Sequence, residues 1–340
     1  MKAQRIIPLF VLILFSCHRE KSHLQIEKGI YHWKSSYSPK ANSLAQCARL
    51  GIEKQYIRLF DIDWLNGKAE ALSILHFDQA APENFVPVIY ITNRVFRQLP
   101  AADIEHFAKQ VAQKIETFAQ KHAFKFQEIQ LDCDWSESTR NAYFQFSKVF
   151  KSQFPESLTL SATIRLHQIK FMEKTGIPPI DRGILMLYNV GDWRRLETKN
   201  SLFDPEIIDQ YISRIPEYPI PLDIALPIYS QLIVYRQKRF FSFLKNTEIE
   251  NLKKHLTLEK LEETNYWQVI ENGHFDQKSF RPGDTVREEH VAFATLRAVQ
   301  KAVLKGIQNK TCRVILFDLD ENSLSHYSEK EYNTLFTYSK

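Results

Sequence analysis

The chain of 340 residues has only four cysteines, Cys17, Cys47, Cys133 and Cys312, and none of them forms a Cys-x-x-Cys pair. This scarcity excludes a standard zinc cluster and a dense disulfide framework, although a single disulfide stays open. The histidines lack His-Glu-x-x-His spacing, so no metal site is indicated. A Gly-x-Gly-x-x-Gly turn and a Walker loop are also missing, and we expect no cofactor.

Long apolar runs and dense basic runs are absent as well. The longest apolar stretch near the start, Ile6 to Phe15, has about half of the roughly twenty residues that a membrane-spanning helix needs. Clustered lysine and arginine and an RNA-binding signature do not occur. We therefore expect no permanent membrane span and no nucleic-acid partner.

The N-terminus has the layout of a secretory signal. Lys2 and Arg5 form a charged start, the apolar run follows, and Leu14-Phe15-Ser16-Cys17 comes next. These last four residues resemble the bacterial lipobox, in which the cysteine is lipidated, although Phe15 is bulkier than usual; the alternative is an ordinary signal peptide. We expect a signal peptide over 1–17, lipidation of Cys17, a tether over 18–28 and an extracytoplasmic protein, periplasmic or at the cell surface, anchored to a bacterial membrane.

Removing Lys2 and Arg5 lowers the formal charge from +5 to +3 and leaves just over three hundred residues, a normal size for a closed α/β barrel. Short runs rich in β-branched and aromatic residues then recur along the chain and predict eight strands. The predicted strands are Gly29 to Lys34, Gln55 to Asp63, Val86 to Thr92, Glu128 to Asp134, Leu158 to Arg165, Gly183 to Asn189, Leu222 to Tyr229 and Arg313 to Asp320.

Segments with helical periodicity separate several of these strands. They are Ala102 to His122, Ser138 to Phe154, Pro205 to Arg214 and Val286 to Ile307. Strands that alternate with amphipathic helices pair in parallel, and eight such units predict a single (β/α)8 TIM barrel over 29–340. A doubly wound open sheet is the alternative. Leu65 to Glu83 and Ser230 to Asp284 do not alternate in this way and are expected to be excursions, the second between strands seven and eight.

Two acids stand together at the end of the fourth strand. In an extended chain Asp132 and Asp134 share one face with Gln130 and Ser136, because side chains alternate. Neighbouring carboxylates repel and lose hydration, so folding alone gives little reason to place them there. The pair therefore predicts a functional site.

In a TIM barrel the carboxyl ends of all strands meet at one face, where enzymes of this fold keep their sites. Here most strands end in carboxylates, amides or aromatic rings, the groups that bind sugar hydroxyls and cover the apolar faces of sugar rings. We therefore expect a glycan or oligosaccharide partner. The expected binding residues are Trp33, Arg58, Asp63, Trp64, Asn93, Asn189, Trp193, Tyr229, Asp320 and Glu321.

Three strand motifs resemble those of the chitinase-like family 18 glycoside hydrolases. They are residues 131–134 (LDCD), 186–189 (MLYN) and 226–229 (LPIY), in the family's order and spacing. The resemblance implies that Asp132 and Asp134 match the two inner acids, of which the second orients the substrate's acetamido group, and that Tyr188 supports that group. Asn189 replaces the usual aspartate, and Ser136 stands where the family has its proton-donating glutamate.

A serine hydroxyl is far too weak an acid for that proton transfer, and Glu137 would point to the opposite face of a continued strand. Three functions stay open. The first is a hydrolase that pairs Asp134 with Asp63, Asp320 or Glu321. The second is a barrel that binds a glycan without cleaving it, and the third is a scaffold lipoprotein that binds protein.

Structural roles compete with these functions. Asp134 or Ser136 would cap the helix that follows, and Tyr188 and Tyr229 would serve as core aromatics. Residues 283–290 (GDTVREEH) are predicted to begin a helix, with Asp284 or Thr285 as its cap and two glutamates in its first turn. The alternative is that Arg287 and Glu288 reach the barrel mouth.

Overall fold

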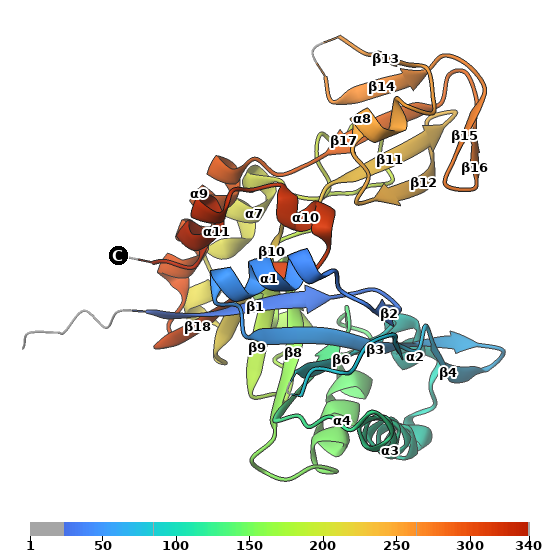
Figure 1. Ribbon diagram of the computed structural model, residues 1–340. Helices are drawn as coiled ribbons and strands as arrows, with labels where there is room; N and C mark the ends of the chain where they lie inside the picture. The colour runs from blue at the N-terminus through green and yellow to red at the C-terminus, as the bar shows by residue number, and fades with distance from the viewer. Residues whose placement is uncertain (1–23, 84, 263, 339–340) are drawn as a thin grey trace, which may run out of the picture.

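Eight parallel strands close into a barrel in the computed structural model, which describes residues 24–338 except 84 and 263. The barrel is closed because β1 pairs with both β18 and β3 (Figure 1). The predicted (β/α)8 fold is thus confirmed. Its strands are β1 (Gln25–His32), β3 (Lys54–Leu65), β6 (Val86–Ile91), β7 (Glu128–Asp132), β8 (Thr159–Arg165), β9 (Arg182–Met186), β10 (Leu222–Pro227) and β18 (Thr311–Phe317).

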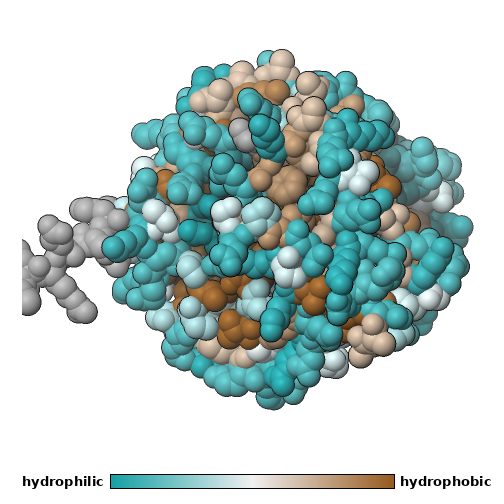
Figure 2. Space-filling model, turned by 90° about the horizontal axis from the view of Figure 1, so that it is seen from below, coloured by the Kyte–Doolittle hydropathy of each residue, from teal (hydrophilic) through white to brown (hydrophobic). Residues whose placement is uncertain are grey.

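Helices cover the outside of the barrel through apolar stripes. In α3 (Ile104–His122) the buried residues include Phe107, Val111 and Ile115, which follow the spacing expected from the sequence. Seen from below the view of Figure 1, the molecule carries mostly hydrophilic side chains on its surface, with scattered hydrophobic patches (Figure 2). The other helices of the barrel are α1 (Ala41–Leu50), α2 (Asn93–Gln98), α4 (Arg140–Lys151), α5 (Leu166–Lys170), α6 (Met172–Thr175), α7 (Pro205–Ile212), α9 (Phe293–Gly306), α10 (Glu321–Ser325) and α11 (Glu329–Leu335).

The barrel interior near the amino ends of the strands is ionic. Arg313 donates from Nη1 to Glu128 (2.6 Å) and from Nε to Glu27 (3.0 Å), and its guanidinium lies 3.7 Å from Asp223. Asp223 also accepts a hydrogen bond from Arg182 at 2.7 Å. Buried carboxylates are tolerated in a core only with such partners, so this network supports the lower half of the barrel.

Both predicted excursions are present. Residues of the first form a hairpin strand, β4 (Lys68–Leu72), against β3, and a short strand, β5 (His76–Phe77), that pairs with β2 (Ser36–Tyr37). The second excursion is an antiparallel sheet that projects from the barrel between β10 and β18 (Figure 1).

The projecting sheet has its own apolar core, which includes Leu232, Val234, Leu244 and Trp267. Its strand order is β12-β11-β17-β14-β13, and α8 (Ile249–Leu252) packs on it. The strands are β11 (Gln231–Arg236), β12 (Arg239–Lys245), β13 (Leu258–Lys260), β14 (Tyr266–Val269) and β17 (Thr285–Glu289), joined by a small hairpin of β15 (Gly273–Phe275) and β16 (Lys278–Phe280). We call this sheet and its connections, residues 231–289, the insertion.

The helix predicted over 286–307 is wrong at its start, because α9 begins only at Phe293. Residues 285–289 form β17, which lies between β11 and β14, and its backbone groups pair with both neighbours. Asp284 is not a helix cap: it accepts two hydrogen bonds from Arg236, at 2.9 and 2.7 Å. Pairing with distant strands outweighs the local helix signal here.

The amino-terminal predictions lie mostly outside the described residues. The predicted signal peptide, Cys17 and residues 18–23 lie outside the described residues, while residues 25–28, which we expected in the tether, belong to β1. Among the described residues, Cys47, Cys133 and Cys312 are buried free thiols and form no disulfide with one another. Within the same ranges, no helix is long and apolar enough to cross a membrane, and no group of three or more potential ligands is placed to hold a metal.

Candidate functional site

A cleft of about 640 Å³ opens at the carboxyl ends of the strands. Asp134 and Arg165 line it from the barrel, and Phe243 and Lys245 of β12 line it from the insertion. The loop after β9 supplies Trp193, and Tyr229 follows the end of β10. The cleft is therefore shared by the barrel mouth and the insertion.

The two acids of the fourth strand have different surroundings. Strand β7 ends at Asp132, so the alternation expected through Asp134 and Ser136 does not continue beyond it. Asp132 is buried and accepts a hydrogen bond from the Thr163 hydroxyl at 2.6 Å. Burial, with a smaller contribution from the charge of Asp134, raises the pKa of Asp132 from 3.8 to about 6.

Asp134 lies in the cleft and forms a two-point ion pair with Arg165. The guanidinium donates from Nε to Oδ1 at 2.5 Å and from Nη2 to Oδ2 at 3.1 Å. A proton on Asp134 would break this charge-assisted pair, so the geometry does not suit a general acid. Sequence reasoning missed Arg165, whose only signal was its place at the end of a predicted strand.

Ser136 belongs to a small hydrogen-bond network. The Asn93 side-chain amide donates to the Ser136 hydroxyl at 3.3 Å, and the Thr139 hydroxyl donates to Asn93 at 2.6 Å. The Ser136 backbone N–H donates in turn to Thr139 at 2.9 Å. Asn93 therefore holds the turn between β7 and α4, and it does not line the cleft.

The acids predicted as partners of Asp134 lie elsewhere. Asp63 is paired with Arg94, whose hydrogen bond is the main cause that lowers the pKa of Asp63 to about 2. Asp320 pairs with Lys34 at 2.5 Å and caps α10, and Glu321 pairs with Lys40. None of these three acids lines the cleft. Arg58 is likewise occupied, because it donates two hydrogen bonds to Asp61, at 2.9 and 2.7 Å.

Of the predicted aromatic residues, some line the cleft and others lie outside it. Trp193 and Tyr229 line the cleft, and the Tyr229 hydroxyl donates to Asn189 at 3.2 Å. Trp33 packs against Tyr90 in the mouth, and Trp64 packs against the core beside Asp63. Tyr188 is buried, and this burial raises its pKa well above the usual 10.0. None of the last three contributes to the lining of the cleft.

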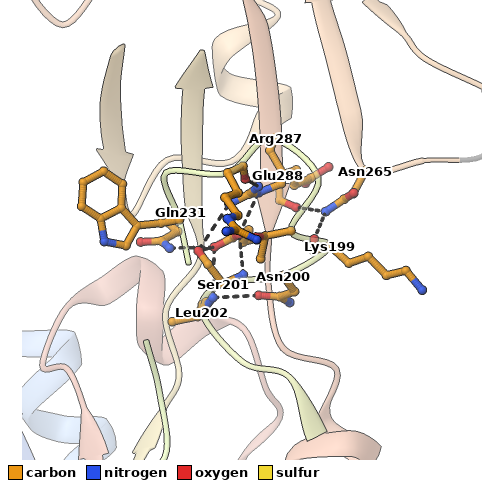
Figure 3. Close-up of polar contacts among 12 residues, drawn as sticks. Lys199, Asn200, Ser201, Leu202, Gln231, Asn265, Arg287 and Glu288 are labelled. Atoms are coloured by element: carbon orange, nitrogen blue, oxygen red, sulfur yellow. Dashed lines mark hydrogen bonds and ion pairs between the residues drawn. The ribbon is translucent and has the colours of Figure 1, made fainter. Parts of the chain in front are cut away.

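A buried ion pair fixes the loop that carries Trp193. Arg287 donates from Nε to Glu289 at 2.9 Å, and both side chains are 0% exposed. Glu289 also accepts hydrogen bonds from the backbone N–H groups of Ser201 (2.6 Å) and Leu202 (3.1 Å) and from the Gln231 amide (2.7 Å). Figure 3 shows Ser201, Leu202 and Gln231 gathered beside Arg287 at the end of β17. Arg287 and Glu288 belong to a strand and not to a helix, and neither of them lines the cleft at the barrel mouth, contrary to both sequence interpretations.

Further hydrogen bonds join the insertion to the same loop, residues 193–202. The Tyr235 hydroxyl donates to the Trp193 carbonyl at 2.6 Å, and Arg287 Nη1 donates to the Arg195 carbonyl at 2.8 Å. The Asn265 amide donates to the Lys199 carbonyl at 2.9 Å (Figure 3). Because several elements of the insertion hold this loop, the position of Trp193 at the cleft is set in advance of any ligand.

The barrel is similar to the barrels of several solved structures. The C-terminal domain of a putative chitinase from Desulfitobacterium hafniense matches with a TM-score of 0.56 and 9% identity, covering 93% of this chain and 99% of that one. A GH18 chitinase from Cycas revoluta in complex with (GlcNAc)3 matches with a TM-score of 0.52 and 12% identity, covering 92% and 100%. The fold is that of the family 18 chitinases.

The spore cortex-lytic enzyme SleL of Bacillus cereus has the same chitinase-type barrel, with a TM-score of 0.52, 12% identity and coverage of 92% of this chain and 74% of that one. No protein-family model and no curated protein matches the sequence. The resemblance predicted from three strand motifs is thus confirmed for the fold. In this barrel Asp134 is paired with Arg165.

Replacing Asp132 by asparagine is expected to change how the stability of this chitinase-type barrel depends on pH. The folded pKa of about 6 exceeds the unfolded value of 3.8, so the stabilising contribution of Asp132 is lost as the pH rises from 4 through 6. Asparagine keeps an oxygen for Thr163 but carries no charge. The free energy of unfolding of the variant, compared with that of the wild type, should increase by about 1 to 3 kcal/mol between pH 4 and pH 8. Urea unfolding at both pH values measures this, and an unchanged difference would contradict it.

Proposed function

We propose that this barrel binds an extracytoplasmic glycan at its C-terminal mouth without hydrolysing it. The observation that carries the proposal is the two-point ion pair between Arg165 and Asp134 in the cleft. Glycoside hydrolysis generally needs a proton donor together with a base or nucleophile. An aspartate that is neutralised by a guanidinium serves neither role well, while the pair still presents polar groups to sugar hydroxyls.

The other groups of the cleft support recognition. Trp193 offers an aromatic surface, and its ring packs edge-on against Phe240 and Phe243, with centroids 4.5 and 5.1 Å away. The Asn189 amide and the Tyr229 hydroxyl line the same cleft and are able to bind sugar hydroxyls. The one further carboxylate among the described lining residues is Asp192, which lies 3.6 Å from Arg195 and 4.0 Å from Arg194.

The experiment measures binding and turnover on the same samples. Purified protein is titrated calorimetrically with chitin-type, peptidoglycan-type, plant and host oligosaccharides, and the products are examined by mass spectrometry. We expect binding without cleavage. Turnover would overturn the non-catalytic proposal, and its loss in Asp134→Asn would then assign the reaction to this aspartate. Absence of any glycan binding would contradict the proposal as a whole and favour a protein-binding scaffold.

Truncating Trp193 to alanine is expected to weaken glycan binding about tenfold or more, because a central aromatic contact is commonly worth roughly 2 kcal/mol. The Trp193 carbonyl remains available to Tyr235 in this variant, so the loop keeps its anchor. The matched control is Trp64→Ala, which removes an equal side chain outside the cleft. Equal losses in the two variants would show that the cleft is not the binding site.

Under this proposal the barrel is held at a bacterial membrane by a lipid on Cys17. Only residues 18 to 24 separate that cysteine from the start of β1 at Gln25, so the barrel would lie close to the membrane. Replacing Cys17 by serine is expected to abolish incorporation of labelled fatty acid and to release the protein from the membrane fraction. A Cys47→Ala variant, which changes a buried thiol, should still be labelled. Labelling that persists in Cys17→Ser would refute the anchor.

A further inference from the structure

We infer that the cleft selects a negatively charged glycan, with charge on a carboxylate or sulfate group. This inference rests on the proposed function and specifies its ligand. Arg165 and Asp134 neutralise each other in the cleft. The remaining charged side chains of the lining, with the histidine aside, are Arg194, Lys245 and Asp192. Asp192 lies beside Arg194 and Arg195, so Lys245 contributes a positive charge that the lining does not balance.

The unbalanced charge comes from an unusually basic part of the chain. Residues 224–247 contain no aspartate or glutamate, while Arg236, Lys238, Arg239 and Lys245 lie within that stretch. Arg236 pairs with Asp284. Among the described residues, the other three form no ion pair within 4.0 Å, so this side of the insertion keeps its positive charge.

A β-bulge directs this strand toward the cleft. Val234 pairs with Ser242 and Tyr235 with Phe240, which leaves Phe241 as the extra residue. The bulge puts Phe240 and Phe243 on one face, where both contact Trp193, and Lys245 continues that face two residues on. The opposite face, with Leu232, Val234 and Leu244, packs into the core of the insertion.

Arg194 supplies the second cation next to the same aromatic surface. Its guanidinium lies 4.0 Å from the centre of the Trp193 ring. An anionic sugar that stacks on this part of the cleft would therefore meet Arg194 and Lys245. Cations at a partly enclosed surface raise the local concentration of anionic ligands and favour them over neutral ones.

The test uses three ligands with one backbone: (GlcNAc)4, its 6-O-sulfated form and its 6-carboxylated form. They are titrated into the full-length protein in low salt and in 0.5 M salt. We expect at least one charged form to bind tenfold or more tightly than the neutral tetramer in low salt. High salt should reduce that preference, because exposed charges are screened. A preference for one charged form identifies the anion as carboxylate or sulfate.

Variants separate this inference from the proposed function. Lys245→Gln and Arg194→Gln should each reduce the ratio of charged-ligand affinity to neutral-ligand affinity at least threefold. Lys109→Gln, on the exposed surface of α3, should leave the preference unchanged. Equal binding of all three ligands would overturn the charge selectivity and leave glycan binding intact. If none of the ligands binds, both the charge selectivity and the proposed glycan binding are contradicted. If the preference for charged ligands survives in both cleft variants, the assignment of that preference to Lys245 and Arg194 is wrong.

Discussion

Replacing Arg287 by methionine is expected to lower the free energy of unfolding by about 3 to 5 kcal/mol. The substitution leaves the Glu289 carboxylate in a site where both partners are 0% exposed, without its counter-charge. Methionine fills part of the volume but also ends the hydrogen bond from Arg287 to the Arg195 carbonyl. Urea denaturation followed by tryptophan fluorescence measures the loss.

Two further variants show whether the buried pair is the cause. Arg49→Met removes an arginine from an exposed ion pair with Glu329 and should cost less than about 1 kcal/mol. The double variant Arg287→Met/Glu289→Gln removes both charges and should be more stable than the sum of its single changes predicts, by about 1 to 3 kcal/mol. A loss below 1 kcal/mol in Arg287→Met would mean that the ion pair does not hold the insertion against the loop.

The alternating pattern of the chain was sufficient to predict the barrel. Apolar runs such as Val86 to Thr92 are buried on both faces in a parallel sheet, which gives each strand a strong signal. The helical stripe of α3 was equally clear. The alternating pattern does not fix the end of a strand, and β7 ends at Asp132, two residues before the predicted end at Asp134. The local sequence of residues 285–289 predicts a helix. The strands with which these residues pair, β11 and β14, are separate segments that a local pattern does not include.

The candidate site was predicted only in part, because ion pairs join residues that are far apart in the chain. Of the predicted residues, the structure brings Asp134, Asn189, Trp193 and Tyr229 to one cleft. Asp63 and Asp320 stand at the ends of predicted strands, but in the structure they form ion pairs with Arg94 and Lys34. Arg165 and Lys245, which give the cleft its electrostatic character, carried no motif. Spacing along one strand predicts two neighbouring acids, but it does not predict a cation from another strand that pairs with them.

Replacing Arg313, near the amino ends of the barrel strands, by methionine is expected to lower the free energy of unfolding about as much as replacing Arg287 does. Arg313 contacts Glu128, which is 4% exposed, and Asp223, which is 0% exposed, so its removal leaves two buried carboxylates with one cation each. Lys54 remains 3.6 Å from Glu128, and Arg182 remains 2.7 Å from Asp223. We expect a loss of about 3 to 5 kcal/mol at pH 8.

The pH dependence of that loss distinguishes charge from packing. Burial already raises the pKa of Asp223 to about 6, and Arg313 is one of the charges that oppose this rise. Without Arg313 the pKa of Asp223 in the folded protein rises further. Below that pKa the Asp223 carboxyl is protonated and uncharged, so the loss of stability caused by removing Arg313 becomes smaller. The loss should therefore be smaller at pH 5 than at pH 8, as unfolding curves at the two pH values would measure. An equal loss at both would mean that Arg313 acts by filling space, and the ionic interior would then add nothing to the stability of the barrel.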